Sequence, residues 1–119
     1  MPGFRIFTDA PPELADRVVL EVGDELDFDV EDAEDGEFSF RKGSFVASIF
    51  AGAFVKYCNF RVYVTEHEQE TEITIERNSP WWTGILGIDR VKKEAKKLAD
   101  TIEDVLEEEG AQVLDSTTL

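Results

Sequence analysis

The chain contains very few of the side chains that usually build nucleophilic and metal sites. Its 119 residues include one cysteine and one histidine. A single cysteine excludes a disulfide within the chain, and a structural zinc site is not expected because it needs several Cys or His ligands. Cys58 falls at an inward position of an expected strand, whereas His67 stands among glutamates in an expected turn. We therefore interpret Cys58 as a core residue and His67 as an exposed one, too far apart to act as nucleophile and base.

Long apolar runs and a basic N-terminal leader are also missing. No segment approaches the roughly 20 apolar residues that a helix needs to cross a bilayer. The opening residues, Met1 to Arg5, lack the basic and then apolar pattern of a signal peptide. We therefore expect no membrane span and a cytoplasmic location. No phosphate-binding, dinucleotide-binding or zinc motif is visible either, so we expect no cofactor and no enzymatic activity.

Positive charge is scarce, with 12 Lys and Arg against 27 Asp and Glu and a formal net charge of −15. Because such a chain repels a phosphate backbone, nucleic acid is not an expected partner. The acidity is typical of a highly soluble protein, of a salty habitat or of a protein with a basic partner.

The acids are densest between Asp24 and Glu37, where nine carboxylates stand. The spacing of an EF-hand is absent from this stretch. Aligning Gly36 with the invariant glycine of that loop places Lys42 where a bidentate Glu is required. The stretch therefore predicts a solvated strand face and a turn, without a metal.

What the sequence does supply is enough apolar residues for one core. Hydrophobic residues make up 42% of the chain and include nine Phe. A chain of this length is expected to fold as one domain. We predict a single α+β domain over residues 1–110 and a flexible C-terminal tail over residues 111–119.

Two kinds of apolar spacing predict the elements of this domain. Alternation of apolar and polar residues predicts strands near residues 4–7, 26–31, 37–42, 58–65 and 72–76. Apolar residues three and four apart predict helices near residues 11–23 and 89–110. Thr8 or Asp9 is expected to cap the first helix, and Gly23 to end it. Asp89 is expected to cap the last helix, and Gly110 to end it.

Residues 44–54 add one ambiguous element. Phe50 and Phe54 fall on one helical face, which favours a short helix, although a buried strand fits the same pattern. The predicted order is therefore β-α-β-β-(short α)-β-β-α. This order describes an antiparallel β-sheet of about five strands with two main helices packed on one face.

The stretch over residues 78–89 is unusually apolar for a connection between elements. It contains Trp81 and Trp82, followed by Ile85 and Leu86. Adjacent tryptophans in an extended segment point in opposite directions, so one is expected to enter the core and the other to stay exposed as a binding anchor. The alternative is that both close the end of the sheet against the last helix.

Charge is divided along the last predicted helix. Six of the 12 bases lie within residues 77–97, and acids follow over residues 100–109. This order opposes the helix macrodipole. Two such helices placed antiparallel would match the basic half of one with the acidic half of the other, which predicts a homodimer. Two other interpretations are an anion site formed by Arg90 and Lys93 at the start of the helix, and a solvated face whose bases pair with the acidic sheet.

The predicted element order is similar to the β-α-β(4)-α layout of TATA-binding-protein-like and helix-grip folds. It also resembles small acidic secretion chaperones, which dimerise and bind another protein in extended form. The resemblance lies in element order and acidity without a shared motif, so it implies no functional residue. The negative charge also departs from what duplex-DNA binding needs.

Together these features predict a non-enzymatic protein-interaction or chaperone-like binding module that binds through the Trp-bearing stretch. The alternative is a carrier or sensor of a small apolar or anionic ligand. Its pocket would lie between the sheet and the long C-terminal helix, lined by Phe50, Phe54, Trp81 and Trp82. The expected partner is accordingly a second copy of the chain, another protein or a small ligand.

Overall fold

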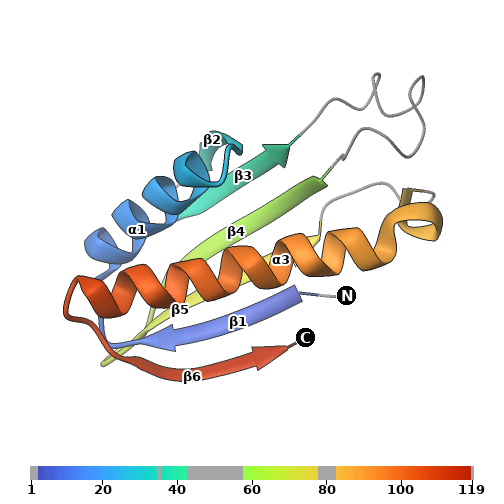
Figure 1. Ribbon diagram of the computed structural model, residues 1–119. Coiled ribbons are helices and arrows are strands. Elements are labelled where there is room, and N and C mark those ends of the chain that lie inside the picture. Colours follow the sequence, from blue (N-terminus) through green and yellow to red (C-terminus); the bar gives the residue numbers. More distant parts are fainter. Residues whose placement is uncertain (1–2, 35, 43–57, 78–82, 119) are drawn as a thin grey trace.

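In the part of the chain that the structure describes, a single antiparallel sheet carries two helices on one face (Figure 1). In this computed structural model the described residues are 3–34, 36–42, 58–77 and 83–118. The elements follow the chain in this order: β1 Gly3–Thr8, α1 Pro12–Glu25, β2 Asp29–Glu34, β3 Glu37–Lys42, β4 Cys58–Glu66, β5 Thr71–Arg77, α3 Thr83–Glu108 and β6 Val113–Thr118. The α+β class is confirmed, and the sheet has six strands rather than about five.

The strands are arranged in the order β2-β3-β4-β5-β1-β6, and every neighbouring pair is antiparallel. The first strand therefore lies between β5 and β6, so both ends of the described chain meet in one part of the sheet (Figure 1). Residues 111–119 were predicted to form a flexible tail. That prediction is wrong for most of the segment, because Val113–Thr118 forms β6 and pairs with β1.

The register of the sheet places apolar residues in rows that cross several strands. Phe38 pairs with Val62, Val62 pairs with Ile75, and Ile75 pairs with Phe4. Side chains that alternate along each strand point to opposite faces, so this row lies entirely on the face that the helices cover. The strands predicted near residues 58–65 and 72–76 are confirmed, and β4 and β5 pair as an antiparallel hairpin.

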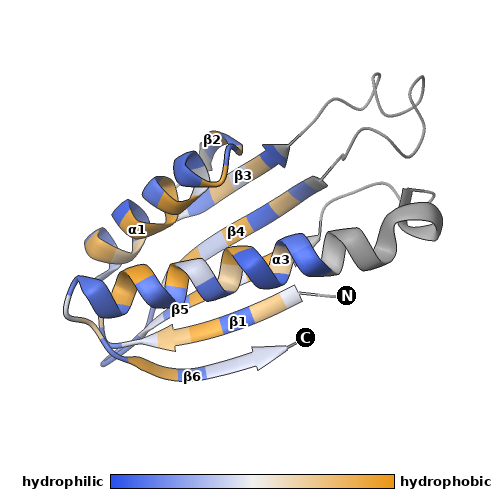
Figure 2. Ribbon diagram, in the orientation of Figure 1, coloured by the Kyte–Doolittle hydropathy of each residue, from blue (hydrophilic) through white to orange (hydrophobic). Residues whose placement is uncertain are grey.

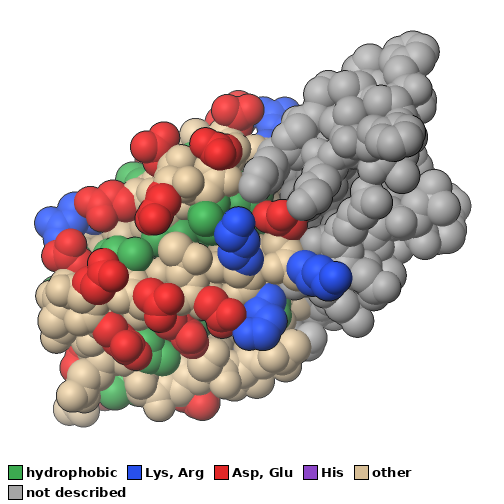
Figure 3. All heavy atoms as spheres, in the orientation of Figure 1, with side chains coloured by type: hydrophobic (Ala, Val, Ile, Leu, Met, Phe, Trp, Pro, Cys, Tyr) green, Lys and Arg blue, Asp and Glu red, His purple; other side chains and the backbone are tan. Residues whose placement is uncertain are grey.

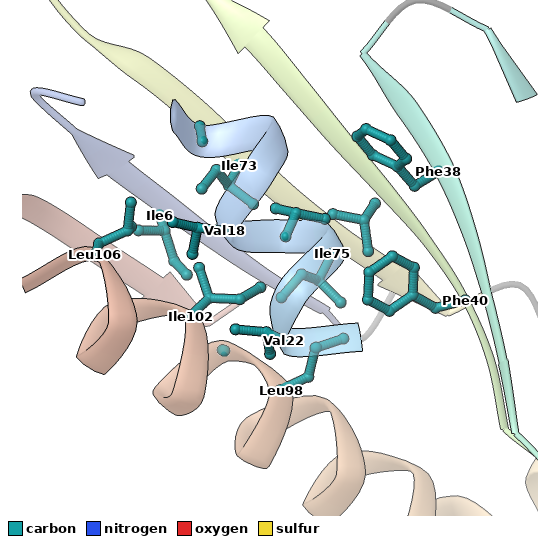
Figure 4. Packing of buried hydrophobic residues seen from close by; sticks show 14 of the residues in the cluster. Ile6, Val18, Val22, Phe38, Phe40, Ile73, Ile75, Leu98, Ile102 and Leu106 are labelled. Carbon is teal, nitrogen blue, oxygen red and sulfur yellow. The ribbon is translucent and has the colours of Figure 1, made fainter. Parts of the chain in front are cut away.

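The core lies between this sheet face and the two helices (Figures 2 and 4). Val18 and Val22 from α1 meet Leu98 and Ile102 from α3 above the strands, and all four are fully buried. Burying a side chain of this size contributes about 1.5–3 kcal/mol. The apolar positions three and four apart in the sequence are the ones that the helices turn toward the sheet.

Gly23 does not end α1, as the sequence analysis predicted, but lies buried within the helix. An added Cβ there would stand 2.6 Å from Val30 Cγ2 and 2.8 Å from Phe40 Cε2, which is too close for ordinary contact. The glycine therefore lets the helix approach β2 and β3. The helix ends two residues later at Glu25, and Asp27, with a φ of 64°, turns the chain toward β2.

The predicted helix caps also differ from the structure. Pro11 is the N-cap of α1 and offers no side-chain hydrogen bond, so neither Thr8 nor Asp9 caps this helix. Asp89 is not the cap of α3, because the helix begins six residues earlier at Thr83. Gly110, with a φ of 91°, follows the end of α3 as predicted. The ambiguous element over residues 44–54 lies outside the described residues.

Candidate functional site: an unprotected sheet edge

Most of the predicted binding residues lie where the structure describes little or nothing. Trp81, Trp82, Phe50 and Phe54 are outside the described residues. The apolar pocket that these four residues were expected to line therefore remains a prediction.

The other predicted binding residues belong to α3. Ile85 and Leu86 lie in this helix rather than in a loop, Arg90 lies further along it, and the side chains of all three are outside the description. Lys93 is exposed on the same helix, as an anion site would require. The start of α3 at Thr83 puts Arg90 and Lys93 well inside the helix, which removes the free backbone N–H groups from that proposed anion site.

His67 is exposed in the turn between β4 and β5, as predicted, and its Nε2 lies 2.9 Å from Glu72 Oε1. Cys58 begins β4. Among the described residues, no group of three or more His, Cys, Asp or Glu side chains is placed to hold a metal ion. None of the described helical segments is both long enough and apolar enough to span a membrane.

The sheet face opposite the helices is polar, and its charges pair across neighbouring strands. Arg5 Nε lies 2.9 Å from Glu72 Oε2. Arg61 Nε lies 3.2 Å from Glu37 Oε1, and Arg41 donates to Glu31 over 2.9 Å. Each arginine described on this face therefore has a carboxylate partner.

Glu72 is the best connected carboxylate of this face. Burial by itself would raise the pKa of Glu72. Hydrogen bonds from His67 and Thr74 and the charge of Arg5 outweigh burial, so the pKa lies below its ordinary value. The lowered pKa favours the charged form of this carboxylate, and both of its oxygens already bond to groups of the same chain.

The helix layer carries two segments rich in acidic residues (Figure 3). Residues 12–25 hold five acids and one base, and residues 100–109 hold six acids and no base. These two segments pack against each other, and Arg17 donates to Glu109 over 3.1 Å between them. Burial, together with the charges of Asp32 and Glu13, raises the pKa of Asp16 in this layer. The layer therefore favours basic partners over acidic ones.

The two edges of the sheet differ sharply in charge. At one edge, β2 reads Asp-Val-Glu-Asp-Ala-Glu, so four of its six residues are acids. At the other edge, β6 reads Val-Leu-Asp-Ser-Thr-Thr, with one acid and neither lysine nor proline. Natural proteins protect edge strands from pairing with other chains by placing charges or proline on them. By that measure β2 is protected and β6 is not.

Hydrogen bonds at its start hold β6 firmly on the sheet. Thr8 Oγ1 donates to the Gln112 carbonyl over 2.7 Å, and Gln112 N–H donates to Asp9 Oδ1 over 2.7 Å. Ala111 N–H donates to the Leu106 carbonyl over 2.9 Å, which ties the strand to the end of α3. The predicted cap residues Thr8 and Asp9 thus serve to position β6 instead.

Among the described strands, none lies beside β6 on the side away from β1. Within the part of the chain that the structure describes, β1 is its one strand neighbour, and its residues from Leu114 to Thr118 are exposed. Leu114 keeps 49% of its surface exposed, at the register shift opposite Phe7 and Thr8. Alternate residues of an edge strand direct their N–H and C=O groups outward, so β6 offers an open row of donors and acceptors.

Sequence reasoning missed this edge because β6 lacks an alternating apolar pattern. The β-branched residues Val113, Thr117 and Thr118 were the available signal, and they were assigned to a tail. Neither the protein-family models nor the curated proteins compared with this sequence match it.

Proposed function

We propose that this protein is a non-enzymatic protein-interaction module whose recognition element is the free edge of β6. The observation that carries this proposal is the contrast between an edge strand covered with acids and one without protecting residues. An unprotected edge invites a strand from another polypeptide, and such addition is an established mode of peptide recognition.

The affinity of such a contact would come mainly from the backbone. A partner strand that covers the six residues of β6 would form about six hydrogen bonds, at about 0.5–1.5 kcal/mol each. The gain of about 3–9 kcal/mol is then reduced by the cost of association. Because β6 is already held by Gln112 and Ala111, this edge is ordered before the partner arrives. A chaperone-like role, in which a client is bound in extended form, fits the same geometry.

A titration with a neutral peptide of sequence Ser-Thr-Val-Ser-Thr-Val tests this proposal. We expect its addition to shift the backbone amide resonances of residues 113–118. The edge strand β2 serves as the control within the same molecule, and its residues 29–34 should not respond. A neutral probe is chosen because a basic one would be drawn to the acids of β2. The titration is made at a chain concentration at which the protein is monomeric, and shifts centred on β2, or none at millimolar peptide, would then overturn the proposal.

A further inference from the structure

We propose that the strand added to β6 comes from a second copy of this chain, which gives a twofold dimer with a continuous sheet. This inference rests on the proposed function of the β6 edge and names its occupant. Two features of the molecule lead to it: the edge itself, and the division of charge along α3.

The geometry of edge pairing decides how the helices meet. Joining β6 antiparallel to its copy requires a twofold axis perpendicular to the sheet. That axis keeps all helices on one face and makes the two α3 helices antiparallel. Three strand spacings of about 4.8 Å separate the two β1 strands, or about 14 Å. Because α3 contacts β5 and β4 as well as β1 and β6, its axis is not displaced toward β6, and the two α3 axes would lie at least about 14 Å apart. Helices with their side chains are about 10–12 Å wide, so only the long charged side chains of the two helices would approach each other.

The charges of α3 suit this antiparallel arrangement. Lys93, Lys96 and Lys97 are exposed in its earlier part. The later part carries exposed acids: Asp100, Asp104, Glu107 and Glu108. Antiparallel pairing sets the basic part of one helix against the acidic part of the other, whereas parallel pairing would set like charges together. Within one chain, Lys96 already pairs with Asp100 over 2.8 Å, whereas the order of charges otherwise opposes the macrodipole of α3.

Charge also selects β6 over β2 as the dimer edge. Two chains of net charge −15 repel each other, so their contact is expected where acids are fewest. Pairing of β2 with its copy would bring eight acids together, whereas pairing of β6 brings two. An axis through Ser116 places Asp115 of each chain opposite Thr117 of the partner subunit and keeps the two Asp115 side chains apart. The structure thus assigns both the edge and its register.

Sedimentation velocity on the full chain tests the inference, with Ser116→Lys as the perturbation. The wild type should sediment as a dimer at 50 µM. Ser116→Lys places two ammonium groups opposite each other at the axis and should raise the dimer dissociation constant at least tenfold. Thr65→Lys is the matched control, because it adds the same charge at an exposed position of the interior strand β4. It should leave the dissociation constant unchanged.

Crosslinking checks the register independently of stability. In a Cys58→Ala background, Ser116→Cys should form a disulfide-linked dimer under mild oxidation, because residues on the axis face their own copies. Thr65→Cys, equally exposed, should not.

A wild type that is monomeric at 200 µM, or a dimer that Ser116→Lys leaves intact, would overturn the inference. Peptide-induced shifts in β6 of a monomeric chain would leave the proposed function standing while this inference falls. A dimer joined elsewhere, with no peptide response in β6, would remove both.

Discussion

The hydroxyl of Thr8 is the group on which the attachment of β6 depends most directly. Thr8 is fully buried, and its Oγ1 donates to the Gln112 carbonyl over 2.7 Å and accepts from Ala10 N–H over 3.2 Å. Thr8→Val keeps the shape of the side chain and removes both bonds. The buried Ala10 N–H then loses its partner, at a cost of about 1–3 kcal/mol, whereas the Gln112 carbonyl keeps the Asp9 N–H as a donor over 3.2 Å. We therefore expect the free energy of unfolding to fall by about 2–3 kcal/mol, and the melting temperature by about 8–12 °C.

The measurement is urea unfolding followed by circular dichroism, with amide hydrogen exchange as the local readout. Thr8→Ser is the matched control, because it keeps the hydroxyl and loses one methyl group, at a cost of about 1 kcal/mol. In Thr8→Val the amides of β6 should exchange faster by a larger factor than those of β4, because the lost bonds lie where β6 begins. Equal stability of Thr8→Val and Thr8→Ser, with unchanged exchange in β6, would refute the reasoning.

Two further predictions concern the packing of α1 and the polar sheet face. Gly23→Ala should lower the unfolding free energy by about 1 kcal/mol, because overpacking against Val30 exceeds the gain in helix propensity. Val30→Ala should relieve part of that cost in the double variant, because the contact with Phe40 remains, and additive effects in urea unfolding would contradict this. Because the pKa of Glu72 is lowered, this carboxyl group binds fewer protons in the folded protein than in the unfolded chain near its ordinary pKa of 4.5. Glu72 therefore contributes its full stabilisation above pH 4.5, and this contribution is lost as the pH falls below 4.5. Glu72→Gln should therefore lie closer to the wild type in unfolding free energy at pH 3 than at pH 6, and a gap that stays constant would argue against the role of His67 and Arg5.

Local patterns were sufficient for most of the fold. The alternation of apolar and polar residues correctly predicted the strands β3, β4 and β5. It did so because every second side chain of a half-buried strand faces the core. Apolar residues three and four apart predicted α1 and much of α3, because residues at this spacing lie on the same face of a helix. Gly110 was predicted correctly because the left-handed turn after a helix is a local requirement.

The errors arose where distant partners compete for the same residue. Thr8 and Asp9 are good helix caps in isolation, but in the folded chain both bond to Gln112, more than a hundred residues away. A glycine such as Gly23 is typical of a helix end, but here it lies within α1, where Val30 and Phe40 leave no room for a larger side chain. Of the candidate site, the sequence suggested a dimer through the charge order in α3, whereas its signal for β6 was limited to the β-branched residues Val113, Thr117 and Thr118.

The sequence by itself determined the α+β class, the apolar rows that form the core and the uneven distribution of charge, because these depend on neighbours along the chain. Only the tertiary structure decided that residues 113–118 become an edge strand and that β1 lies between β5 and β6. A strand without an apolar pattern forms where another strand offers it unpaired backbone groups, and that partner is chosen by how the whole chain packs.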